Sequence, residues 1–178
     1  MLIGLEDGIR RLVLLYSVIF GFEGIPLLYM GDELALRNDP GYLADPALAP
    51  DNRWMHRPPM DRDAAARRRD PATLEGRVWR EVRRLGEVRR AQLALRGGVE
   101  SAVVDAGSDA VLVWRRKHPR SGAFVGLANF SPSPQAVDAD TVTGFGSFEQ
   151  VHGSDGVLPV RDGQVVVPGL GFAWYAEP

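Results

Sequence analysis

The hydrophobic pattern of this chain changes its period at Gly97-Gly98, and that change limits the fold more than any other feature. Before the pair, apolar residues recur with helical spacing, and after it they alternate in short runs separated by turn residues. Short strands at such intervals are typical of an antiparallel sandwich. We therefore expect two domains, 1–96 and 97–178. The expected strands of the second are 101–104, 110–116, 123–130, 148–152, 164–167 and 172–176.

The composition is that of a globular chain held together by a packed core. The 178 residues include no cysteine, which excludes disulfides and thiolate metal sites, and 21 Lys and Arg balance 23 Asp and Glu. This near-neutral charge argues against nucleic-acid binding. The apolar run 12–22 is too short to cross a bilayer, and Glu6 and Asp7 interrupt the basic segment of a secretion signal. We expect a cytoplasmic protein with no membrane and no nucleic-acid partner.

The first domain has the pattern of a parallel α/β unit. Apolar residues from Ile9 to Phe20 predict a helix buried on most sides, and the continuous apolar run Ile25–Met30 predicts a strand covered on both faces. Residues 35–72 are rich in Pro and Asp and show no sustained period, which indicates a long ordered loop, and such loops are usually functional. A second helix, with Asp70 as its N-cap, is expected to run to about Leu95.

Two carboxylates, Asp32 and Glu33, follow the predicted strand directly. Ligand sites of parallel α/β folds form at the carboxyl ends of strands, and paired carboxylates serve acid–base or glycoside chemistry. In the alternative, structural interpretation, one carboxylate caps the following turn and the other pairs with a loop arginine. Spacing alone favours the structural interpretation.

The segment from 51 to 61 concentrates Arg53, Arg57, His56 and Trp54 in one proline-stiffened loop. Guanidinium groups bind carboxylates or vicinal hydroxyls, and an indole face suits a sugar ring. A loop locked by internal Arg–Asp salt bridges would have the same composition, so ligand binding and internal bridging are equal alternatives. The histidines lack acidic or histidine neighbours at metal-ligand spacing, so we expect no metal and no cofactor.

Several stretches resemble the α-amylase superfamily of sugar-transforming enzymes. Residues 11–33, ending in GIPLLYMGDE, are similar to the last helix-to-strand step of its catalytic barrel, and residues 57–61 (RPPMD) to the R-x-P-M loop of its α-glucosidase branch. The narrower resemblance is to amylosucrase, carried by NDPGYLADPALAPDNRWMHRP at 38–58. It implies the C-terminal segment of a (β/α)8 TIM barrel, with an inserted loop at 35–72, followed by a small antiparallel β-sandwich. The implied fold class is α/β plus all-β.

Amylosucrase-like enzymes are retaining glucosyltransferases that move glucose from sucrose to an α-1,4-glucan and release fructose. The resemblance implies that Arg53 contacts the fructosyl side of sucrose, and that other residues support the site or hold its loop. Those supporting residues are Asp32, Glu33, Asp51, His56 and Arg57.

The catalytic residues of that family have no counterpart in this sequence. The nucleophilic Asp, the acid/base Glu and a His-Asp pair belong to earlier strands, and no His-Asp dipeptide occurs here. A complete barrel takes about 250 residues, whereas the predicted sandwich begins at residue 97. We expect no catalytic residue and no activity from this chain alone. The expected partners are sucrose, an α-glucan and an upstream polypeptide that carries the rest of the barrel.

Two alternatives stay open at this point. One is a non-catalytic glucan-binding or assembly module that uses Trp54 as a sugar platform, with Trp114 and Trp174 better explained by core packing. The other is a fragment of a related α-glucosidase or trehalose-forming enzyme.

Overall fold

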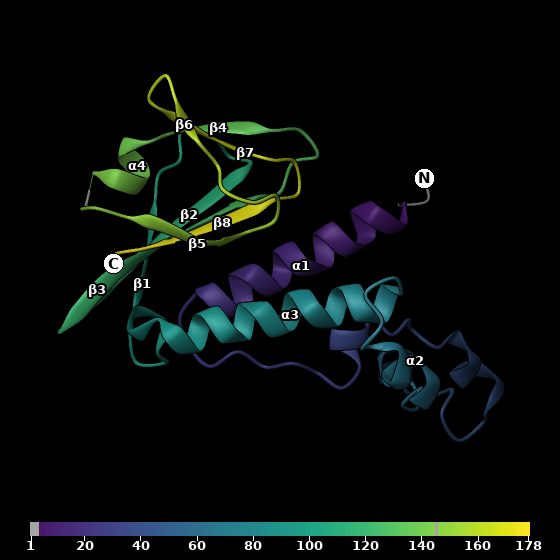
Figure 1. Ribbon diagram of the computed structural model, residues 1–178. Coiled ribbons are helices and arrows are strands. Elements are labelled where there is room, and N and C mark those ends of the chain that lie inside the picture. The colour runs from purple at the N-terminus through teal and green to yellow at the C-terminus, as the bar shows by residue number, and fades with distance from the viewer. Residues whose placement is uncertain (1–3, 145) are drawn as a thin grey trace. The chain divides into compact units, whose positions relative to one another are not determined.

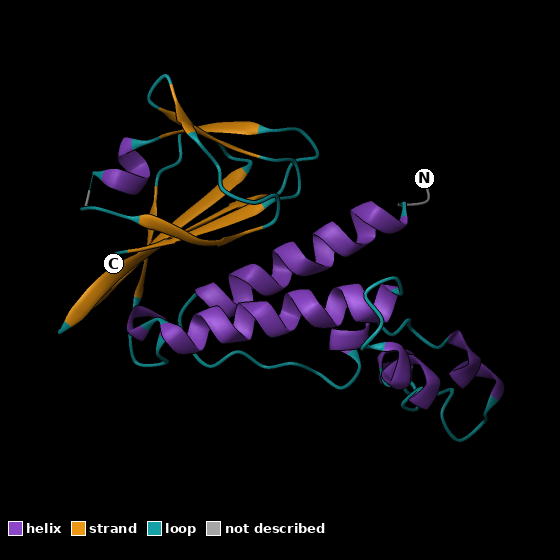
Figure 2. Cartoon of the chain, viewed as in Figure 1, coloured by secondary structure: helices purple, strands orange, loops and turns teal. Residues whose placement is uncertain are grey.

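The computed structural model describes residues 4–144 and 146–178, which form two compact units (Figure 1). The sandwich unit comprises residues 1–26 and 84–178, and the loop unit comprises residues 27–83. These units divide the chain at other positions than the predicted domains 1–96 and 97–178, because the first helix and the end of the second belong to the same unit as the strands. Strands occur only in the sandwich unit among the described residues (Figure 2).

The strands form two antiparallel sheets, which agrees with the predicted sandwich. The larger sheet has the order β1-β2-β3-β8-β5 and the smaller sheet the order β4-β7-β6. Their bounds are β1 (Ser101–Val104), β2 (Val111–His118), β3 (Ser121–Asn129), β4 (Gln135–Asp138), β5 (Glu149–Gly153), β6 (Val160–Arg161), β7 (Gln164–Val167) and β8 (Phe172–Ala176).

Apolar residues from both sheets meet in one core. Val113 and Leu127 of the larger sheet are fully buried in the same cluster as Val137 and Val167 of the smaller sheet. The short helix α4 (Asp140–Thr143) adds Val142 to this cluster. Sheet-on-sheet packing through alternate residues accounts for the period-two pattern of the sequence.

The helix α1 (Leu5–Gly21) packs on the larger sheet through its carboxyl end. A Cβ at Gly21 would lie 2.7 Å from the indole of Trp114 and 3.2 Å from that of Trp174, and a Cβ at Gly126 would also collide with Trp114. Only glycine permits so close an approach of backbone to ring. Trp114 and Trp174 are both 0% exposed, so the prediction that they are core residues is confirmed.

A buried arginine joins α1 to the sheet. Arg116 of β2 is 0% exposed, and its Nη1 donates to the carbonyls of Gly21 (3.3 Å) and Phe22 (2.7 Å). Its Nη2 donates to the carbonyls of Arg96 (2.7 Å) and Val99 (2.6 Å). Burial lowers the pKa of Arg116 to about 10, and the charge of Arg89 acts in the same direction. The charge is thus held by carbonyl dipoles.

The histidine of β5 lies among aromatic rings. His152 of β5 lies edge-on to Phe172 and Trp174, with ring centroids 5.2 and 5.9 Å away. Its Nε2 is buried and has no hydrogen-bond partner among the described residues. Burial, and then the charge of Arg84, lower the pKa of His152 to about 4.

The loop unit is built from short helical turns that aspartate side chains begin. The turns are η1 (Asp32–Leu34), η2 (Pro40–Ala44), η3 (Asn52–His56) and α2 (Arg62–Arg67), and the long helix α3 (Leu74–Ala91) starts here before η4 (Leu93–Leu95). Carboxylates accept the N–H two residues ahead, at 2.8 to 3.0 Å, which satisfies the free donors of each turn. The aspartates in this role are Asp39, Asp45, Asp51, Asp61 and Asp70.

Two predictions about this region are wrong. The segment Ile25–Met30 forms no strand, and Ile25 and Leu27 are 89% and 76% exposed. A parallel strand needs neighbours to satisfy its backbone, and no strand of the described residues pairs with it. The helix α3 begins after Thr73, whose Oγ1 accepts from Gly76 N at 3.1 Å, whereas Asp70 caps the turn before it.

Removing the guanidinium of Arg116 should destabilise the sandwich unit. Arg116→Met removes the charged donor of the Gly21, Arg96 and Val99 carbonyls and leaves Phe22 O only with Arg89 at 3.5 Å. We therefore expect the free energy of unfolding to fall by about 3 kcal/mol. Urea denaturation followed by tryptophan fluorescence measures the loss. Arg161→Met, at an exposed site on β6, is the matched control and should change stability by less than about 0.5 kcal/mol. Equal stability of the two variants would contradict the role of Arg116.

Stability should fall as the pH drops from about 6.5 to about 4. The unfolded chain takes up a proton on His152 near pH 6.5, whereas the folded chain resists protonation until about pH 4. The neutral form stabilises the fold fully above this window, and we expect a loss of about 1–2 kcal/mol within it, reduced by partial solvent access. Urea midpoints at pH 7.5 and pH 5 measure it. His152→Phe should show a smaller pH-dependent loss, and an unchanged loss would contradict the assignment.

Candidate functional site

The residues that the sequence singled out lie in the loop unit, on two separate turns. Asp32 and Glu33 belong to η1, and Asp51, Arg53 and His56 belong to or flank η3. No hydrogen bond described in the structure joins Asp32 or Glu33 to Asp51, Arg53 or His56.

The carboxylates of Asp32 and Glu33 both bind the backbone of their own turn. Asp32 Oδ2 accepts from Tyr29 N and Glu33 Oε2 accepts from Gly31 N, each at 3.2 Å. Gly31 has a φ of +93°, a conformation that glycine adopts without strain. Both donors precede the carboxylates in the chain, and η1 has no side-chain cap at its N-cap residue Gly31. The two carboxylates therefore bind the backbone before them and do not cap the turn that follows.

Asp51 and Arg53 form a forked ion pair at the start of η3. Arg53 Nε lies 2.8 and 3.0 Å from the two carboxylate oxygens of Asp51, and Nη2 lies 2.7 Å from Oδ2. These side-chain bonds, and then the backbone N–H of Arg53, lower the pKa of Asp51 to about 2. The pairing uses Nε and Nη2, so Nη1 has no protein partner among the described residues. Arg53 thus has a fixed orientation and one edge open to solvent.

The loop that carries this pair is closed at its base. Asp39 N donates to Met55 O at 2.8 Å, and His56 Nδ1 lies 3.1 Å from Asn38 Oδ1. These contacts join the two ends of the segment 38–56. His56 and Asn38 therefore contact each other at the base of this loop.

Arg57 ends η3 and contributes to the charge of the loop. Its N–H donates to Trp54 O at 3.1 Å, and its charge helps to lower the pKa of Asp51. Trp54, next to Arg53, is 38% exposed. The structure therefore sets an exposed indole beside an oriented guanidinium.

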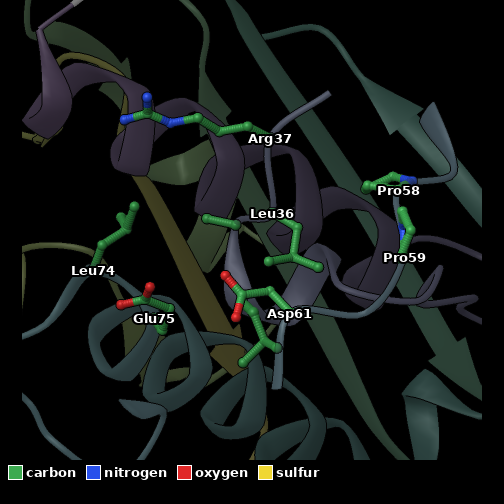
Figure 3. Close-up of a pocket in the computed structure, with 9 residues that line it drawn as sticks. Leu36, Arg37, Pro58, Pro59, Asp61, Leu74 and Glu75 are labelled. Carbon is green, nitrogen blue, oxygen red and sulfur yellow. The ribbon is translucent and has the colours of Figure 1, made fainter. Parts of the chain in front are cut away.

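A cavity that sequence reasoning did not find lies elsewhere in the loop unit. It has a volume of about 420 Å³ and brings together the turn after η1, the segment before α2 and the start of α3 (Figure 3). Arg37 and Glu75, which no sequence pattern connects, both line it. No spacing rule could have found this group, because its members are 38 residues apart and meet only through the fold.

No group of three or more His, Asp or Glu side chains in the described part of the chain could hold a metal ion. No helix in the same residues has the length and apolar character needed to cross a bilayer.

Comparison with known sequences finds distant relatives. No family model matches the chain. Glucosylglycerate phosphorylase of Escherichia coli (strain K12) is 23% identical over 161 residues, which are 90% of this chain and 28% of that protein. A 1,4-alpha-glucan branching enzyme of Mesorhizobium japonicum is 28% identical over 130 residues, which are 67% of this chain and 14% of that protein.

Solved structures show the same fold at low sequence identity. A mutant of the trehalulose synthase MutB soaked with trehalulose has a TM-score of 0.69 at 17% identity, and a MutB mutant in complex with the substrate sucrose has 0.69 at 16%. Bacillus licheniformis trehalose-6-phosphate hydrolase has 0.69 at 14%. Each match covers 94% of this chain and 38% of the solved chain.

These relatives and structural neighbours are α-amylase-family enzymes. The chain spans less than a third of the curated relatives and 38% of the solved chains. It has the fold of the C-terminal part of these TIM-barrel enzymes, with helices followed by a β-rich domain.

Proposed function

We propose that the chain is the C-terminal part of an amylosucrase-like enzyme, which transfers glucose from sucrose to an α-1,4-glucan. The observation that carries the proposal is the Arg53–Asp51 pair on a loop closed by Asn38 and His56. The segment 38–58 is the one whose sequence resembles amylosucrase. A cytoplasmic location stays a prediction within this proposal.

In this function Arg53 binds and orients sucrose. Asp51 holds the guanidinium through Nε and Nη2, and Nη1 is left to donate to a hydroxyl of the fructosyl unit. A guanidinium that is already oriented loses little side-chain entropy on binding. His56 and Arg57 keep the loop in place, and Asp32 and Glu33 keep η1 in place, without reaching the substrate. None of them is proposed as a catalytic residue.

The rest of the barrel is proposed to come from an upstream polypeptide. Three apolar side chains of α1 face solvent: Leu5, Leu15 and Ile19 are 57, 53 and 42% exposed. Exposed apolar surfaces of this kind mark interaction sites. The solved structures that match the chain hold 62% of their length outside the match (100% less 38%), which is the part that carries earlier barrel strands in the family resemblance.

A glucan-binding module is the second candidate. Burial of Trp114 and Trp174 removes both as sugar platforms, whereas the exposed Trp54 keeps this function open. The branching enzyme and the glucosylglycerate phosphorylase among the relatives support a carbohydrate substrate in general. They also keep a related fragment, acting on another sugar, as an alternative to sucrose.

The chain alone should release no fructose from sucrose. Among the described residues, the carboxylate bonded to Arg53 is that of Asp51, and the ion pair occupies it. Glycosyl transfer needs two free carboxyl groups, one as nucleophile and one as acid, and neither is in place here. A coupled fructose assay measures the rate against a heat-denatured control. Steady release above that control would contradict the proposal.

Supplying the earlier strands should restore activity in a way that depends on Arg53. The chain is refolded together with the N-terminal part of an amylosucrase-like barrel, and fructose release is measured. Arg53→Ala should lower kcat/KM for sucrose by about tenfold or more, because a charged hydrogen bond is lost. Arg53→Lys should recover only part of it, because lysine lacks the fork that pairs with Asp51.

The control for this experiment is Arg69→Ala, which removes an exposed arginine of the same unit. It should retain the restored rate. No restored activity on co-refolding, or equal rates for Arg53→Ala and Arg69→Ala, would count against a sucrose-binding role.

A further inference from the structure

We propose that the cavity of the loop unit is a second sugar subsite, which binds one neutral hexose ring apart from Arg53. Its walls come from the turn 34–37, the segment 58–61 and the first turn of α3, and all of them lie within one compact unit. The choice of a sugar as ligand rests on the proposed carbohydrate function. The position of the subsite rests on the cavity itself.

The turn on one side of the cavity has a well-defined shape. The backbone N–H groups of Leu34 and Leu36 both donate to Gly31 O, at 3.0 and 3.1 Å. Ala35 has a φ of +51°, which is uncommon for a residue with a Cβ and costs conformational energy. This turn places Leu36 and Arg37 in the cavity wall.

The opposite walls contain the carboxylates of Asp61 and Glu75, and in each of them the described hydrogen bonds involve one oxygen only. Asp61 accepts both capping bonds of α2, from Asp63 N and Ala64 N at 2.9 Å, on its Oδ1 alone. Glu75 receives Arg67 on Oε1, at 2.5 Å from Nη2. The capping bond and the ion pair hold the two groups in position, and Asp61 Oδ2 is left without a protein donor among the described residues.

A cation of the wall has no protein partner either. Arg37 is exposed and makes no hydrogen bond or ion pair among the described residues, and Figure 3 shows its guanidinium apart from the carboxylates of Asp61 and Glu75. Asp61 Oδ2 lacks a donor and Arg37 lacks an acceptor among the described residues, whereas the charge of Glu75 is already paired with Arg67. A neutral ring with several hydroxyls satisfies both groups, because one hydroxyl can donate to Asp61 and another can accept from Arg37.

The remaining walls suit the carbon faces of a sugar. Leu34, Leu36, Leu74, Pro58 and Pro59 are apolar, and three of the five are aliphatic side chains that can pack on C–H groups. The volume of about 420 Å³ lies in the range of about 300–1,000 Å³ typical of small-molecule sites. Arg53 and Trp54 are not among the lining residues, so this subsite is separate from the proposed sucrose contact.

The test is an NMR titration of the full chain with sucrose, with maltose and with glucose 6-phosphate. The methyl signals of Leu36 and Leu74 report occupancy of the cavity directly. We expect at least one of the two neutral sugars to shift them saturably at about 50 mM or below, which also identifies the source of the ring. The anionic sugar should not bind more tightly than the neutral ones, because repulsion of its phosphate by Asp61 offsets the attraction by Arg37, and Glu75 is already paired with Arg67.

Two variants remove polar groups without removing structure. Arg37→Gln has no hydrogen bond or ion pair with the described residues to lose. Asp61→Asn keeps the Oδ1 acceptor that caps α2 while it replaces Oδ2 by an amide. Each should weaken binding of the neutral sugar about tenfold. Arg69→Gln, an exposed arginine outside the cavity, should leave the affinity unchanged. If circular dichroism shows that Asp61→Asn alters the helix content, Arg37→Gln decides alone.

The outcome is independent of catalysis. The absence of saturable shifts at Leu36 and Leu74, or equal affinity of the native chain and Arg37→Gln, overturns the subsite. Preferential binding of glucose 6-phosphate also overturns it. Because the readout needs neither fructose release nor Arg53, a failed subsite leaves the proposed glucosyl transfer intact, and a failed transfer assay leaves the subsite intact.

Discussion

The sandwich unit depends on how the carboxyl end of α1 is held. The last carbonyls of a helix carry partial negative charge and have no partners within the helix. Here Gly21 O accepts from Trp114 Nε1 at 2.9 Å and from Arg116, and Arg89 Nη2 donates to Gly24 O at 2.7 Å. Two guanidinium groups and an indole therefore satisfy this end, and the missing side chain of Gly21 lets them approach. Without these bonds the chain would bury both an arginine charge and several unpaired carbonyls.

The loop unit keeps a long segment ordered although none of its described residues belongs to a sheet. Aspartate side chains cap several of its turns. The Asp51–Arg53 ion pair and the His56–Asn38 contact at the base of the loop 38–56 add further order. Because each carboxylate binds backbone two residues ahead, order is built locally and needs no distant strand. Asp61 has two roles in this unit, since its Oδ1 caps α2 and the residue also lines the cavity.

Much of the fold could be predicted from periodicity, and the failures share a cause. Among the described residues, six of the eight strands and both long helices follow from apolar spacing, whereas β4 and β6 were not predicted. The strand β6 has only two residues, and β4 directly follows the Ser- and Pro-rich turn 131–134. Ile25–Met30 has the composition of a buried strand, but a strand exists only with neighbours to bond. Of the candidate site, the pairing of Asp51 with Arg53 was one of the open alternatives, and the ligand-binding alternative uses the same arginine. The cavity around Arg37 and Glu75 had no signal, because residues far apart in sequence form it.

The sequence by itself determined the local features of the sandwich unit: which of its longer segments are helical or extended, and that Trp114 and Trp174 belong to the core. These depend on neighbours a few residues away, so the order of residues specifies them. Only the tertiary structure decided that Arg116 is buried against carbonyls, that Thr73 rather than Asp70 starts α3, and that Arg37 and Glu75 share one cavity. Each of these is a contact between distant segments, or a choice between equally good caps, and such choices are made by packing.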